Sequence, residues 1–148
     1  QKLSYICQKM GLETNYSFNF YIHGPYSISL TNDYYHYHNN VPKMSTTYEP
    51  NNNEIKIFKK IEEFLFSHSV YCKKPIDLLE AATTIMYINE KNPDLLDDEL
   101  FEKTKKNKQF LSDKTIIIAN NIVKELLFKP EYLTDEIKDE IEMWDDVE

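Results

Sequence analysis

Arginine is absent from this 148-residue chain, because all 17 of its basic residues are lysines. The planar guanidinium group of arginine is the side chain that most often reads guanine edges and that grips phosphate with two parallel hydrogen bonds. Base-specific DNA recognition therefore lacks its commonest tool. This disfavours a nucleic-acid partner, although lysines can still contact a phosphate backbone without sequence specificity.

Glycine and cysteine are almost as scarce, with two residues of each. Loops that cradle phosphates need several glycines within a short span, so we expect no nucleotide cofactor and no other cofactor. Cys7 and Cys72 show no spacing typical of a metal or redox site. Two isolated thiols fit a reducing compartment, and we predict a cytoplasmic protein.

Long hydrophobic runs are also missing. No apolar stretch approaches the ~20 residues of a membrane span, and no cleavable leader is visible, so we expect no membrane partner. The chain begins with Gln1 in a stretch whose residue pattern already indicates a helix. We therefore leave open that further residues precede it in the natural protein.

The hydrophobic pattern is mainly helical. Apolar residues at helical spacing predict helices over 2–10, 54–67, 75–89 and 113–127 and after Thr134. A further helix over 28–37 is predicted after Ser27, and a highly charged one over 97–106. Ser27, Ser112 and Thr134 are suitable N-caps, and Pro75 suits a first helical position. Residues 39–53 predict a loop, with a wing-like strand at 44–48. We predict a mainly α fold with a small β element (α+β), winged-helix or helix-turn-helix-like.

Negative charge collects at the C-terminal end. Residues 131–148 contain nine acids and one lysine, whereas residues 1–130 hold 16 of each sign. We expect one domain over 1–130, followed by an acidic C-terminal helix or tail over 131–148. A solvated acidic face is favoured over an acidic docking site.

The most distinctive stretch covers residues 16–37. Tyr16, Phe18, Phe20 and Ile22 alternate with polar positions, which predicts a half-buried strand. Glycine and proline then break the pattern, and we expect Gly24 to adopt a backbone conformation that a Cβ disfavours. We predict that this turn and the helix after it hold a partner through His23, Gly24, Pro25, Tyr26, Ser27, Tyr34 and Tyr37.

The sequence gives little support for a catalytic site or a metal site. His36 and His38 lie near Asp33, but on a helix side chains two positions apart point about 200° from each other, so only an extended segment would let them share an ion. His23 has no nucleophile or carboxylate at diagnostic spacing. We predict no catalytic residue and no metal. Four lysines form a cluster interpreted as a solvated face or as a non-specific phosphate contact: Lys103, Lys105, Lys106 and Lys108.

The chain resembles the YwgA-like uncharacterised proteins and, more distantly, the Panacea (SocA-like, phage-associated) antitoxin domain. The segments QKLSYICQKMG, FNFYIHGPYSISLTNDYY, EIKIFKKIEEFL and PIDLLEAATTIMYI carry the resemblance, which covers roughly residues 1–90, with weaker support to about residue 127. The matching positions are Gln1, Lys2, Leu3, Tyr5, Gln8, Tyr21, Gly24, Pro25, Tyr26 and Ser27. The resemblance implies a mostly helical, helix-turn-helix-like fold with a small sheet, and a protein that restrains a toxin or acts as a protease adaptor. The acidic end after Pro130 departs from the family pattern.

Three functions remain open from the sequence. The leading hypothesis is a non-enzymatic protein-interaction domain, an antitoxin-like neutraliser or adaptor whose partner is a protein such as a toxin. The alternative is a winged-helix regulator that binds nucleic acid. A histidine-dependent hydrolase or nuclease using His23, His36 or His38 ranks third.

Overall fold

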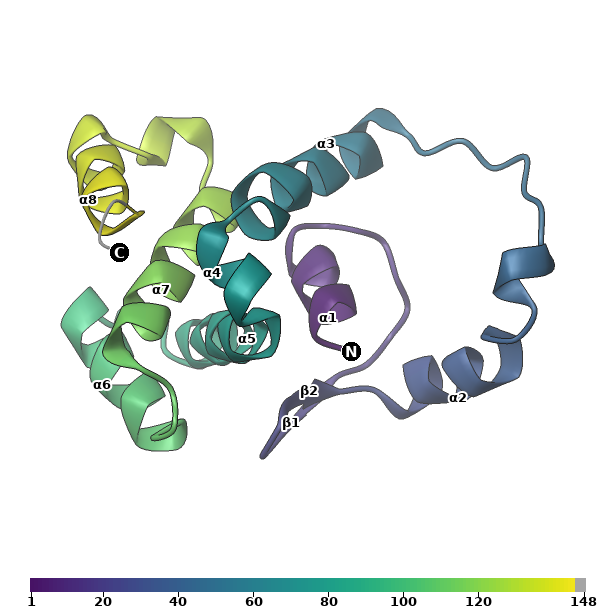
Figure 1. Cartoon of the computed structure of the whole chain (residues 1–148), viewed down its shortest axis with the longest axis horizontal. Coiled ribbons are helices and arrows are strands. Elements are labelled where there is room, and N and C mark those ends of the chain that lie inside the picture. Colours follow the sequence, from purple (N-terminus) through teal and green to yellow (C-terminus); the bar gives the residue numbers. More distant parts are fainter. Residues whose placement is uncertain (146–148) are drawn as a thin grey trace. The chain divides into compact units, whose positions relative to one another are not determined.

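The computed structural model describes residues 1–145, apart from the side chain of Asp145. Helices dominate these residues, and a single two-stranded antiparallel sheet is present among them (Figure 1). The expected class, mainly helical with a small β element, is confirmed. The chain divides into two compact units, Gln1–Lys59 and Lys60–Glu148, whereas the sequence suggested a division near residue 130.

The first unit contains all of the β structure in the described residues. Its elements are α1 (Lys2–Lys9), β1 (Asn19–Tyr21), β2 (Gly24–Tyr26), α2 (Ile28–Tyr37), the short 3-10 turn η1 (Val41–Lys43) and α3 (Asn52–Lys60), at whose end the division falls. The bounds of α2 agree with the predicted 28–37, and the Ser27 hydroxyl accepts a hydrogen bond from the amide of Leu30 at 3.3 Å. That bond satisfies a donor that the first helical turn leaves free.

The hairpin is the part of the fold that the sequence reading missed. β1 and β2 pair antiparallel with Phe20 opposite Pro25 and Tyr21 opposite Gly24, so the chain turns back at once instead of passing directly into α2. Gly24 has φ +100°, as predicted. Proline is tolerated here because in a two-stranded sheet each strand is an edge and its outer side needs no N–H donor.

The predicted alternation holds only up to Phe20. Tyr16, Phe18 and Phe20 are half-buried and alternate with exposed Ser17 and Asn19. Ile22 is 83% exposed, so its predicted burial is wrong, because it lies in the hairpin turn beyond the end of β1. The predicted wing-like strand at 44–48 is not formed in the described structure.

All of the regular secondary structure in the described residues of the second unit is helical. Its elements are the π-helical turn η2 (Ile61–Phe66), α4 (Ser69–Lys73), α5 (Pro75–Lys91), α6 (Asp97–Asn107), α7 (Asp113–Leu127), the 3-10 turn η3 (Pro130–Tyr132) and α8 (Asp135–Asp145). Three predicted helix starts are confirmed: Pro75 is at N1, the Ser112 hydroxyl accepts from the Thr115 amide, and the Thr134 hydroxyl accepts from the Ile137 amide. The predicted acidic segment 131–148 is helical over 135–145, and residues 146–148 lie outside the described part.

The core of this unit is the contact between α5 and α7, which is the most extensive between any two of its elements. Its buried side chains are aliphatic: Leu78, Ala81, Ala82, Ile85, Met86 and Ile88 on α5, and Ile116, Ile118, Ala119, Ile122, Val123 and Leu126 on α7. Thr83 and Thr84 are also buried, and their hydroxyls donate to carbonyls one turn earlier in α5. These bonds satisfy polar groups that would otherwise destabilise the core.

The helix predicted over 54–67 differs in its geometry and in its buried face. The α-helix ends at Lys60 and a π-helical turn follows, marked by the Ser67 amide bonding to the Glu62 carbonyl five residues earlier. The buried positions in this stretch are Ile57, Ile61 and Leu65. Ile55 and Phe58 were predicted on the buried face, which is wrong: they are 39% and 46% exposed and lie off the four-residue spacing of the buried set.

The lysine cluster is not uniformly solvated. Lys108 is buried, with its ammonium 2.5 Å from a carboxylate oxygen of buried Glu80 on α5, so its expected exposure is wrong. Lys105 bonds to the Leu111 carbonyl and to Asp113. Two of the four lysines thus stabilise the turn between α6 and α7.

None of the described helices combines the length and the apolar character that a membrane span requires.

We expect Gly24→Ala to lower the free energy of unfolding by at least ~1 kcal/mol, because a Cβ is strained at positive φ. Denaturant unfolding measures this, with the exposed position Ser17→Ala as a control that should leave the midpoint unchanged. An unchanged midpoint for Gly24→Ala would show that the hairpin does not require this conformation.

We expect Lys108→Met to destabilise the chain by ~3–5 kcal/mol, because it leaves the buried Glu80 carboxylate without its lysine. Lys106→Met, at an exposed position in the same cluster, should change stability by no more than ~0.5 kcal/mol. Thermal or urea unfolding distinguishes the two, and equal effects would contradict a structural role for Lys108.

Candidate functional site

The hairpin is held in place by Gln1. Its side-chain carbonyl accepts from the Ser27 amide at 2.8 Å, and its side-chain NH₂ donates to the Ser27 carbonyl at 3.1 Å and to the Thr31 hydroxyl at 2.6 Å. One amide therefore satisfies both backbone groups of Ser27 and reaches the first turn of α2. Ser27 is 1% exposed, so its ends of the two bonds are shielded from water, whereas the bond from Gln1 to Thr31 is exposed.

Gln8 performs a similar task at the other end of α1. It donates to the Tyr16 carbonyl at 3.0 Å, and its own carbonyl accepts from the Thr14 hydroxyl. Tyr5 between the two glutamines is buried and meets Phe18 edge to face, with ring centroids 5.5 Å apart. The first helix thus fixes the loop that leads into β1, and the hairpin that follows.

An open hollow of about 650 Å³ lies over the hairpin, and we call it the hairpin hollow. It is lined by Gln1, Lys2, Tyr21, Ile22, His23, Gly24, Pro25, Tyr26 and Ile28. The rings of Tyr21 and Tyr26 meet edge to face at 6.1 Å, and both remain exposed to solvent. Its lining is mainly apolar, so the hollow suits an apolar or aromatic group of a partner.

The helix α2 contributes no buried residue to the fold. Tyr34, Tyr35 and Tyr37, which we call the α2 tyrosines, are 60%, 69% and 46% exposed. Tyr34 and Tyr37 are three positions apart and therefore share a helix face. The Tyr34 ring also stacks on His38, with centroids 5.1 Å apart. The α2 tyrosines therefore form an aromatic surface and do not belong to the buried core.

A hydrogen bond ties this helix to the loop before β1. The Tyr16 hydroxyl donates to the Asp33 carboxylate at 2.8 Å, and this bond raises the pKa of Tyr16 because it stabilises the protonated phenol. Together with the contact from Gln1 to Thr31, it anchors α2 at two points. The α2 tyrosines are thus displayed by a positioned helix.

His36 and His38, at the end of α2, contact neighbouring groups of that helix. His38 bonds through Nδ1 to backbone carbonyls of Tyr34 and Tyr35, and the His36 ring packs against Tyr37. No set of three or more potential metal ligands comes together among the described residues. In this arrangement the histidines support neighbouring tyrosines.

The predicted partner-binding residues separate into two kinds. His23, Tyr26, Tyr34 and Tyr37 are exposed and available for contact. Gly24, Pro25 and Ser27 are buried: Gly24 and Pro25 shape the hairpin and line the floor of the hairpin hollow, and Ser27 caps α2. The hairpin hollow brings His23 and Tyr26 together, whereas Tyr34 and Tyr37 lie on α2.

Comparison with known proteins adds no assignment. Neither a scan of protein-family models nor searches of curated proteins and of solved structures gave a match.

Several exposed apolar and aromatic residues of the hairpin and α2 lie outside the predicted partner-binding set. Ile22 and Ile28 are 83% and 64% exposed beside the hairpin, and Tyr21 and Tyr35 are exposed at 55% and 69%. A signal for Tyr21 existed, because it falls on the polar side of the strand alternation. Nothing in the spacing identified Ile22, since its apolar character matched the expected buried face.

Proposed function

We propose that this chain is a non-enzymatic protein-interaction domain that holds a protein partner on the hairpin hollow and the α2 tyrosines. The observation that carries the proposal is that α2 buries none of its residues, yet presents three exposed tyrosines. Tyrosine offers a large rigid contact area at little conformational cost and is enriched at binding hot spots.

The distribution of aromatic residues supports this proposal. Tyr5 is the one aromatic residue in the described chain with less than 9% exposure, although the sequence contains 20 Phe, Tyr and Trp residues. An aliphatic core leaves the aromatic side chains at or near the surface. Large exposed apolar groups gathered on one segment are typical of an interaction surface.

Neutralisation of a toxin is the most concrete form of the proposal, and it follows from the resemblance to the Panacea domain. In that form the partner is a toxin protein, and the chain acts by occupying its surface. We place this activity in the cytoplasm, where the free thiols Cys7 and Cys72 stay reduced.

A winged-helix domain that binds nucleic acid is less well supported. Residues 44–48, where a wing was expected, have no strand, and Lys105 and Lys108 of the lysine cluster are engaged within the fold. Lys103 and Lys106 are the members that stay exposed. Phosphate contacts through two lysines give weak binding that falls as salt rises.

We expect Tyr34→Ala to weaken capture of the partner by ~1–3 kcal/mol while leaving the circular dichroism spectrum unchanged, because the side chain lies outside the core. Pull-downs from the source cells measure this with wild-type and Tyr34→Ala baits at low and high salt. The matched control is Tyr132→Ala, which removes an equally exposed tyrosine, at 61%, from the second unit.

Loss of one protein band with Tyr34→Ala, but not with Tyr132→Ala, supports the proposal. Equal recovery of every protein by all three baits would contradict it. Recovery that disappears with nuclease, or with Lys103→Ala and Lys106→Ala, would favour the nucleic-acid alternative.

A further inference from the structure

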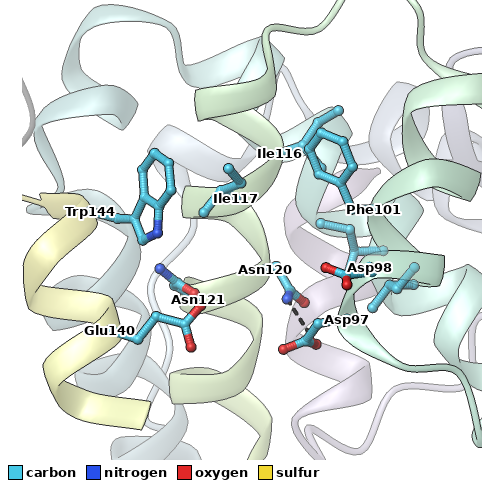
Figure 2. A pocket seen from close by; sticks show the side chains of 11 residues that line it. Asp97, Asp98, Phe101, Ile116, Ile117, Asn120, Asn121, Glu140 and Trp144 are labelled. Carbon is cyan, nitrogen blue, oxygen red and sulfur yellow. Dashed lines mark hydrogen bonds between the residues drawn. The ribbon is translucent and has the colours of Figure 1, made fainter. Parts of the chain in front are cut away.

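A second candidate site lies wholly within the second unit and does not depend on the proposed function. It is a cavity of about 340 Å³ among α6, α7 and α8 (Figure 2). The residues that line it are Ile85, Asp97, Asp98, Leu100, Phe101, Ile116, Ile117, Asn120, Asn121, Glu140 and Trp144. Its volume falls in the range of ~300–1,000 Å³ that is usual for small-molecule pockets.

Asn121 gives this cavity an unsatisfied polar group. Its side chain is 3% exposed, and its Nδ2 has no hydrogen-bond partner among the described residues. Figure 2 shows the amide projecting from α7 toward the α8 side chains Glu140 and Trp144. A buried amide N–H without an acceptor is costly and uncommon, so this donor calls for an acceptor atom inside the cavity.

The walls of the cavity suit an apolar and planar body. Leu100, Ile116 and Ile117 supply aliphatic surface, and Phe101 and Trp144 supply aromatic rings from α6 and α8 (Figure 2). Aromatic faces attract organic cations through the ring quadrupole.

The charged groups of the cavity are all acidic, and one of them is already engaged. Asp97 accepts from the Lys124 ammonium at 2.6 Å and from the Asn120 amide at 3.2 Å. Partial burial by itself raises the pKa of Asp97, but the bonds from Lys124 and Asn120, with the lysine charge, outweigh it and hold that pKa below its usual value. Asp97 therefore stays ionised and paired with Lys124.

Asp98 and Glu140 have no cationic partner within the described part of the chain. Asp98 lies in the first turn of α6, where the helix dipole stabilises a carboxylate. Glu140 lies in the middle of α8, exposed at the rim of the cavity and facing it (Figure 2). Two carboxylates without counter-charges therefore face a pocket with aromatic walls.

We propose that this cavity binds a small organic amine with an apolar, preferably aromatic, body and an acceptor oxygen. The protonated amine pairs with Glu140 at the rim of the cavity, and Asp98 adds a second negative charge to the lining. The body of the ligand lies against Trp144, Phe101 and the isoleucines, and its oxygen accepts from Asn121 Nδ2.

Tyramine is a suitable probe because it carries a protonated amine, an aromatic ring and a hydroxyl acceptor. Two relatives test the parts of the site separately: phenethylamine lacks the hydroxyl, and 4-hydroxyphenylacetate replaces the amine by a carboxylate. Trp144 is the single tryptophan of the chain, so its fluorescence, excited where tyrosine and the probes do not absorb, reports binding at this cavity. Titration calorimetry of the full chain provides the affinities.

We expect a saturable change in Trp144 fluorescence with tyramine and no binding of 4-hydroxyphenylacetate. Phenethylamine should bind at least about tenfold more weakly than tyramine, since one buried hydrogen bond is worth about that factor. Asn121→Leu should keep or raise the melting temperature, because it removes an unsatisfied donor, and should weaken tyramine about tenfold without affecting phenethylamine. Glu140→Gln should weaken both amines. Glu142→Gln, an exposed acid on the same helix outside the cavity lining, should bind both as the wild type does.

Several results would overturn the proposal. These are the absence of a saturable signal with tyramine, equal binding of tyramine and 4-hydroxyphenylacetate, or wild-type affinity in both Asn121→Leu and Glu140→Gln. Glu140 is exposed, so its variant should fold and test the site even where Asn121→Leu does not. A site that holds only water satisfies Asn121 but gives no dependence on the charge of the probe.

Discussion

The contact between α5 and α7 is the interaction on which the second unit depends. The buried aliphatic side chains are Leu, Ala, Ile and Met on α5 and Ile, Ala, Val and Leu on α7. The alanines Ala81, Ala82 and Ala119 are buried and allow the helices to approach closely. Burial of aliphatic surface is the main stabilising contribution to such a core. α6 and α8 pack on this pair, and the buried Lys108–Glu80 ion pair joins the turn after α6 to α5.

A core built from aliphatic side chains leaves the aromatic ones to other tasks. In the first unit, Tyr5 and Phe18 pack together, while most tyrosines of the hairpin and α2 remain in solvent. Polar contacts from Gln1, and from Tyr16 to Asp33, take the place of hydrophobic burial in positioning α2. An exposed aromatic helix that is anchored by hydrogen bonds is consistent with a surface that another molecule covers.

Local sequence signals predicted well where helices begin. Ser27, Pro75 and Ser112 each act at the predicted helix start, because capping depends on a few neighbouring atoms. Two features were missed. The second strand of the hairpin pairs Phe20 with Pro25 across a tight turn, and the break at glycine and proline did not indicate that pairing. The burial of Lys108 depends on a distant partner, Glu80, which lies 28 positions earlier.

Which residues of the candidate site are exposed could be predicted only in part. Tyrosine content identified Tyr26, Tyr34 and Tyr37, but composition does not reveal which side chains the fold covers. Ser27 looked available and is enclosed by Gln1, whereas Ile22 looked internal and is exposed. The cavity beside Asn121 had no signal in the sequence, since it requires α6, α7 and α8 to be assembled.

The exposure of the α2 tyrosines implies that they are not needed for folding. Urea unfolding of the triple variant Tyr34→Ser/Tyr35→Ser/Tyr37→Ser measures this, because tyrosine and serine have similar helix propensities. We expect a loss of less than about 1.5 kcal/mol in the free energy of unfolding, as for three surface substitutions. A loss of ~3–5 kcal/mol for each tyrosine, the cost of truncating a buried aromatic side chain, would contradict it.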